Sequence, residues 1–120
     1  MTFEQIKKLL DMIHDPVEKL EAVMDIGKNS VHTPDSAVCT DIPGCASFVQ
    51  ICRDGNNFYV NADSAIVRGI ATILVSAVNG KTPSQIKKMP LDKMFADLNI
   101  NIGAARLNGV NSMIRFLKNL

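Results

Sequence analysis

The central stretch of the chain is residues 41–51, DIPGCASFVQI, where a turn is followed by one cysteine and then by an alternating apolar segment. Pro43 restricts its own φ angle and Gly44 can adopt a positive φ, so the pair predicts a tight turn. The alternation from Ser47 onward predicts a strand. Cys45 is therefore expected where a loop enters a sheet. Turns run over the surface, which makes Cys45 a candidate reactive thiol, although most free cysteines are inert core residues.

Three extended segments surround this turn. Residues 36–42 predict a first strand, 47–53 a second and 58–62 a third. The sequence Asp-Gly-Asn-Asn at 54–57 is a strong hairpin signal between the last two. The centre of the chain is thus expected to be a small antiparallel meander, with Cys45 in the connection between its first two strands.

Helical periodicity and capping signals predict helices on both sides of the meander, over about residues 2–13, 16–26, 65–78, 83–88, 91–98 and 103–117. The helix over 65–78 has the broadest apolar face and is expected to be the buried helix that covers the sheet. Gly27 is expected to end the second helix, and Gly69 to let the helix over 65–78 pack closely on the sheet. The order predicts an α+β fold with a three-stranded antiparallel sheet covered by helices, in a single domain over residues 1–120.

Composition excludes several classes of function. The 120 residues carry a net charge of +1 and no Trp, so there is no basic, aromatic surface of the kind that binds nucleic acid. No apolar run is long enough for a membrane span, and the first residues lack the pattern of a signal peptide. A cytoplasmic location is the default expectation. Three cysteines, an odd number, predict free thiols rather than a disulfide framework.

The sequence lacks the motifs of the common hydrolases, phosphate-binding loops and dinucleotide sites. Thiol chemistry at Cys45 remains, because a lone thiolate can accept sulfur that a partner supplies in activated form. Arg106 and Asp63 are candidates to tune this thiol. Cys39, Cys45 and Cys52 could instead form a metal site with an aspartate, but their spacing differs from that of zinc-binding pairs. The interpretation favoured for Cys39 and Cys52 is that they are small apolar core residues.

Four segments resemble the SufE family of sulfur-acceptor proteins. IPGCASFV at 42–49 resembles the family's Gly-Cys-x-Ser-x-Val, and NADSAIVRGI at 61–70 its Asp-Ser-x-Ala-Ile-Val-Lys-Gly-Leu. TPSQI at 82–86 matches Thr-Pro-x-x-Ile, and ARLNGVNSMI at 105–114 resembles Ser-Arg-x-x-Gly-Leu-x-x-Met. The four segments occur in the family's order and together span about residues 20–118.

The resemblance implies a role in iron–sulfur cluster assembly and the α+β fold shared with IscU-type scaffolds. A SufE-like protein takes persulfide sulfur from a cysteine desulfurase of the SufS or CsdA type, stimulates that enzyme and passes the sulfur to a SufB-type scaffold. The pyridoxal phosphate belongs to the desulfurase, so the chain itself is expected to hold no cofactor and no metal. It is expected to be a sulfur-transfer accessory protein rather than a stand-alone enzyme.

The resemblance also implies the site. Cys45 matches the sulfur-accepting cysteine, with Gly44 and Ser47 beside it in the same motif, and Asp63 and Arg106 match family positions near that loop. The sequence departs from the family in having Gln50 where a Trp is usual, and in carrying Cys39 and Cys52. The additional cysteines leave open the alternative of an IscU-like metal or iron–sulfur scaffold that uses Cys39, Cys45 and Cys52.

Overall fold

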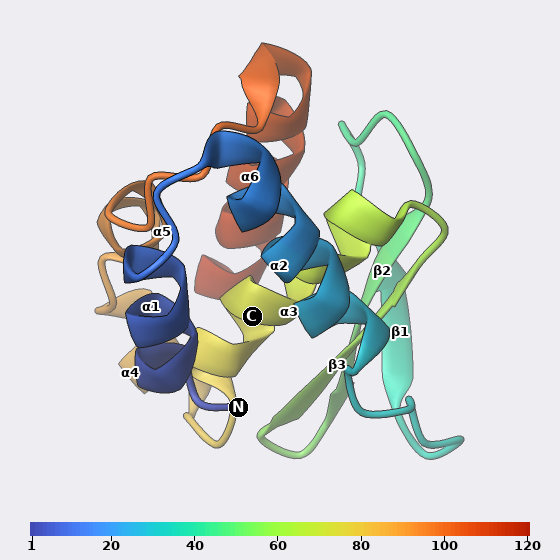
Figure 1. The fold of residues 1–120 in the computed structure, drawn as a ribbon. Helices are drawn as coiled ribbons and strands as arrows, with labels where there is room; N and C mark the ends of the chain where they lie inside the picture. The colour runs from blue at the N-terminus through green and yellow to red at the C-terminus, as the bar shows by residue number, and fades with distance from the viewer.

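A three-stranded antiparallel sheet with the strand order β1-β2-β3 forms one side of the molecule, and six helices gather against one of its faces (Figure 1). The computed structural model describes all residues from 1 to 120. In chain order the elements are α1 (Phe3–Asp11), α2 (Pro16–Lys28), β1 (Val38–Asp41), β2 (Val49–Asp54), β3 (Asn57–Ala62), α3 (Ala65–Val78), α4 (Pro83–Lys87), α5 (Leu91–Ala96) and α6 (Gly103–Lys118). The predicted α+β class and the predicted meander are confirmed.

The register of the sheet separates an apolar face from a polar one. β2 pairs with β1 on one edge and with β3 on the other, and Asp54 lies opposite Asn57, so only two residues turn the hairpin. The inward side chains of β2 and β3 are buried, among them Val49, Ile51 and Val60. Residues of β2 and β3 that alternate with them face away from the helices, because successive side chains of a strand point to opposite faces.

Helix α3 lies at the centre of the core, between α2 and the sheet (Figure 1). Ser64 caps its first turn by accepting a hydrogen bond from the backbone N–H of Val67 at 3.3 Å, as the sequence predicts. Eight of its fourteen residues are buried, which is consistent with the breadth of its apolar face. None of the six helices is long and apolar enough to cross a membrane.

The roles predicted for two glycines were wrong. Gly27 does not end α2, which continues to Lys28, and Gly69 packs on α2 rather than on the sheet. A Cβ atom on Gly27 would lie 2.5 Å from the backbone N of Gly69, and a Cβ atom on Gly69 would overlap the carbonyl of Val23. The backbones of α2 and α3 are therefore in direct contact. A side chain at either glycine would collide with the backbone of the other helix.

The Gly69→Ala substitution is expected to lower the free energy of unfolding by about 1–3 kcal/mol, because the added methyl group meets backbone that cannot rotate away. Urea denaturation followed by circular dichroism measures the change. Ala65→Ser in the exposed first turn of the same helix is the control, with an expected change below about 0.5 kcal/mol. Equal stability of Gly69→Ala and the unmodified protein would contradict the close contact.

Candidate functional site

Cys45 lies in the loop over residues 42–48, which connects β1 to β2. The loop is closed at its base, where the backbone N–H of Ile42 donates to the carbonyl of Val49 at 3.0 Å. The side chain of Ile42 is buried beneath it. One residue before β2, the carbonyl of Phe48 accepts a hydrogen bond from the backbone N–H of Asp63 at 3.3 Å. These contacts hold both ends of the loop and leave its tip, with Cys45, beyond the end of the sheet.

The tip of the loop packs against helix α6. Gly44 has a φ of 80°, and a Cβ atom there would lie 2.8 Å from Oγ of Ser112. Gly109, one turn earlier in α6, faces the thiol itself, since a Cβ atom on it would lie 3.0 Å from Sγ of Cys45. The missing side chain at Gly109 therefore makes the space in which the sulfur atom rests. Gly109 was not among the predicted site residues, although it is the glycine of the motif over residues 105–114 and lies inside a predicted helix.

Cys45 opens onto a cavity of about 200 Å³ between the loop, α3 and α6. Aliphatic side chains dominate its walls, with Val67 and Ile70 coming from α3 and Met113 from α6. The full lining comprises Cys45, Ala46, Ser47, Ser64, Val67, Ile70, Ala105, Arg106, Gly109 and Met113. Oγ of Ser47 is buried in this region and has no hydrogen-bond partner.

The apolar surroundings decide the protonation of the thiol. Cys45 is partly buried, and this burial raises the pKa of the Cys45 thiol above its ordinary value, because desolvation penalises the thiolate. The nearby guanidinium of Arg106 is directed elsewhere, with Nη1 donating to the carbonyl of Ile102 at 3.4 Å. At neutral pH the isolated protein therefore holds Cys45 as a protonated, sheltered thiol.

The structure brings most of the predicted site residues together. Cys45, Ser47 and Arg106 line one cavity, and Gly44 packs on Ser112 of α6. Asp63 is exposed and does not line the cavity, and only its backbone N–H contacts the loop. Its side chain is thus separate from the cavity that surrounds the thiol.

The expectation that all three cysteines are free was wrong. Cys39 and Cys52 are direct partners across β1 and β2, and their sulfur atoms form a disulfide, which leaves Cys45 as the free thiol. The core interpretation was wrong for both residues: Cys52 is fully buried but lies outside the hydrophobic core, on the face of the sheet away from the helices, and Cys39 is exposed. No three His, Cys, Asp or Glu side chains come together as metal ligands. The alternative of a scaffold built from Cys39, Cys45 and Cys52 is therefore contradicted.

The family model for SufE, described as an Fe-S metabolism associated domain, matches residues 4–120. An uncharacterized SufE-like protein of Synechocystis is 27% identical over 106 residues, which cover 84% of this chain and 62% of that protein. The sulfur acceptor protein CsdE of Escherichia coli is 25% identical, with 94% of this chain and 83% of CsdE covered. The chloroplastic/mitochondrial SufE-like protein 1 of Arabidopsis thaliana is 28% identical over 96% of this chain, which corresponds to 33% of that protein.

Among solved structures, the solution structure of a hypothetical protein from Thermus thermophilus superimposes with a TM-score of 0.62. The match covers 98% of this chain and 93% of the other, at 16% sequence identity. The likeness supports the fold.

Alkylation of Cys45 by iodoacetamide is expected to have a pH midpoint above that of the same thiol in the unfolded chain. The thiolate is the reactive form, and burial keeps the thiol protonated to higher pH, so below the midpoint the folded protein reacts more slowly. Rates are measured by intact mass from pH 6 to pH 10. Protein unfolded in urea with its disulfide intact is the control, and a folded midpoint at or below the unfolded one would contradict the burial.

The Gly109→Ala substitution is expected to speed alkylation of Cys45 several-fold at constant pH. The added methyl group would lie 3.0 Å from Sγ of Cys45, closer than ordinary van der Waals contact, so the thiol has to shift away from α6. Asn108→Ala, at the exposed neighbouring position of α6, should leave the rate unchanged. An unchanged rate in a folded Gly109→Ala protein would show that α6 does not hold the thiol.

Proposed function

Since the chain belongs to the SufE family, we propose that it is a sulfur acceptor that carries persulfide sulfur on Cys45 for iron–sulfur cluster assembly. The observation that carries the proposal is the position of Cys45, a free thiol on a loop tip that opens onto an apolar cavity. The proposed donor is a cysteine desulfurase of the SufS or CsdA type, which this chain would also stimulate. The proposed recipient is a SufB-type scaffold.

The chemistry is an exchange between two sulfur-bearing cysteines. The sulfur of Cys45 attacks the terminal sulfur of the desulfurase persulfide, a Cys45 S–S bond forms, and the persulfide bond of the donor breaks. The donor cysteine leaves as a thiolate and takes up the proton that Cys45 gives up. A thiol and a persulfide on each side balance the step, so no external oxidant or reductant is needed. The pyridoxal phosphate that generates the donor persulfide belongs to the desulfurase.

The cavity suits the loaded form of the protein. Its volume of about 200 Å³ is several times the ~30 Å³ that one water molecule occupies in the liquid, so an additional sulfur atom fits beside the thiol. Apolar walls limit the access of oxidants and of other thiols to the persulfide. The hydroxyl of Ser47, which lines the cavity and has no partner, would supply a hydrogen-bond donor for the added sulfur.

Transfer in either direction requires the thiol to leave this shelter. The loop is a short segment whose tip rests on α6, and outward rotation of its tip would bring Cys45 to a partner. Around the cavity the chain exposes apolar and charged groups that a partner could contact. Phe48, next to Ser47 of the cavity wall, is 44% exposed, Arg106 lies on that wall, and Asp63 directly precedes another of its residues. We assign Arg106 and Asp63 to contact with the partner rather than to chemistry on sulfur.

Incubation with a cysteine desulfurase and free cysteine is expected to add one sulfur atom to the protein, as measured by intact mass under non-reducing conditions. Cys45→Ser should abolish the gain, because it removes the accepting sulfur. The Cys39→Ser/Cys52→Ser double variant is the matched control and should still gain the atom. A gain that persists in Cys45→Ser, or no gain in the unmodified protein, would refute the proposal.

A further inference from the structure

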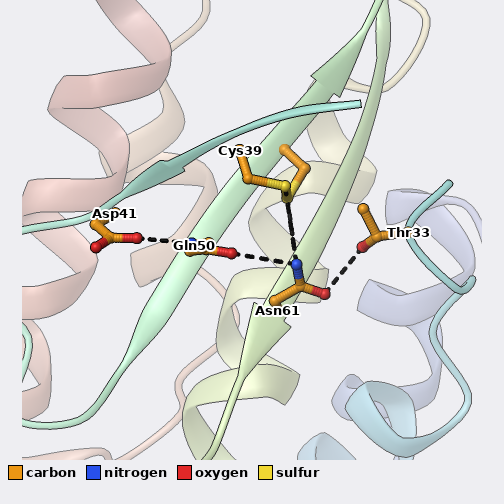
Figure 2. The surroundings of a disulfide bond; sticks show 6 residues. Thr33, Cys39, Asp41, Gln50 and Asn61 are labelled. Carbon is orange, nitrogen blue, oxygen red and sulfur yellow. Dashed lines mark hydrogen bonds between the residues drawn. A yellow bond between two sulfur atoms is a disulfide. The ribbon is translucent and has the colours of Figure 1, made fainter. Parts of the chain in front are cut away.

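The Cys39–Cys52 disulfide lies on the face of the sheet that the helices leave uncovered (Figures 1 and 2). It joins the edge strand β1, all four residues of which are exposed, to the central strand β2. The two cysteines differ sharply in access, because Cys39 is exposed and Cys52 has no exposed surface. An incoming thiolate can therefore reach the bond from the side of Cys39 only.

A side-chain amide is held against both sulfur atoms (Figure 2). Nδ2 of Asn61 lies 3.5 Å from Sγ of Cys52 and 3.8 Å from Sγ of Cys39. Oδ1 of the same amide accepts a hydrogen bond from Thr33 at 3.0 Å, which directs the N–H groups toward the sulfur atoms. A disulfide sulfur is a weak acceptor, whereas a thiolate is a charged acceptor that gains more from an N–H donor. The amide of Asn61 therefore stabilises the broken disulfide, in which one sulfur is a thiolate, more than it stabilises the intact disulfide.

The chain of hydrogen bonds continues across the sheet. Asn61 also donates to Oε1 of Gln50 at 3.3 Å, and Nε2 of Gln50 donates to Asp41 at 2.7 Å. Three side chains, from β1, β2 and the segment before β1, therefore fix the orientation of the amide of Asn61 in β3. Such a preorganised donor is in place before any charge develops on Cys52.

We propose that Cys39–Cys52 is a thiol–disulfide exchange site that takes two electrons from a protein dithiol. A thiolate of the reductant attacks Sγ of Cys39, the Cys39–Cys52 bond breaks, and Cys52 leaves as a thiolate beside the amide of Asn61. The second thiol of the reductant then attacks its own sulfur in the mixed disulfide and releases Cys39. The reductant ends as a disulfide, and its two protons reside on Cys39 and Cys52.

The site is independent of sulfur acceptance at Cys45, but it is placed to affect it. β1 ends at Asp41, and the loop that carries Cys45 follows directly. Reduction removes the covalent connection between β1 and β2, so that hydrogen bonds, without a covalent link, hold the strand that leads into this loop.

The first test compares the two cysteines in a Cys45→Ser background, so that its outcome does not depend on the proposed function. Cys45→Ser/Cys52→Ser leaves only Cys39, and Cys45→Ser/Cys39→Ser leaves only Cys52. The folded variants are treated with 5,5′-dithiobis(2-nitrobenzoate), and release of its thiol is followed by absorbance. Cys39 is expected to react about tenfold faster or more. Equal rates, or a faster reaction at Cys52, would overturn the proposed direction of attack.

The second test opens the intact disulfide of Cys45→Ser with dithiothreitol in native buffer, with alkylation and intact mass to count thiols and circular dichroism to follow the fold. The pair is expected to open while the protein stays folded, and Asn61→Ala should slow opening several-fold because the leaving thiolate loses its donor. Asn111→Ala, an exposed asparagine on α6, is the matched control with an unchanged rate. A bond that opens only on unfolding, or an Asn61→Ala rate equal to the control, would overturn the proposal.

Discussion

The contact between the backbones of α2 and α3 is the constraint on which the other elements depend. Because Gly27 and Gly69 remove the side chains that would hold the helices apart, α3 can be buried between α2 and the sheet. The same helix then presents Val67 and Ile70 to the cavity beside Cys45. A helix displaced outward by one methyl group would widen that cavity, so the packing of the core and the environment of the thiol are set by the same contact.

The environment of Cys45 favours a protonated resting thiol over a rapidly reacting thiolate. Desolvation raises the pKa of the thiol and so disfavours the thiolate. A protein that had to attack unaided would need the opposite arrangement, with a cation or helix N-terminus beside the sulfur. In sulfur acceptance the activated group arrives on the partner. The cost of forming the thiolate can then be offset when the loop leaves the cavity and meets that partner.

Local signals in the sequence predicted most of the elements, because caps and turns act over three or four residues. Thr2 with Gln5, Asp15 and Ser64 all cap the helices expected of them, and the hairpin turn lies where its glycine predicts. What the sequence did not reveal are pairings between distant segments. The partners of Gly69, Gly109 and Cys39 are Val23, Cys45 and Cys52, and each depends on how whole elements pack. To predict the disulfide of Cys39, the register of β1 on β2 would have to be known, and the odd number of cysteines favoured free thiols instead.

The disulfide also bears on how a persulfide could survive on this chain. A second thiol within reach of a persulfide can attack its inner sulfur, release sulfide and leave a disulfide, which ends the transfer. With Cys39 and Cys52 bonded to each other, neither has a thiol to offer, and Cys45 is the single free cysteine. The pair lies on the uncovered face of the sheet, whereas Cys45 opens onto a cavity against α3 and α6. The two proposed sites thus lie on different parts of the fold, and while the disulfide is intact no thiol of the same chain can compete for the persulfide proposed for Cys45.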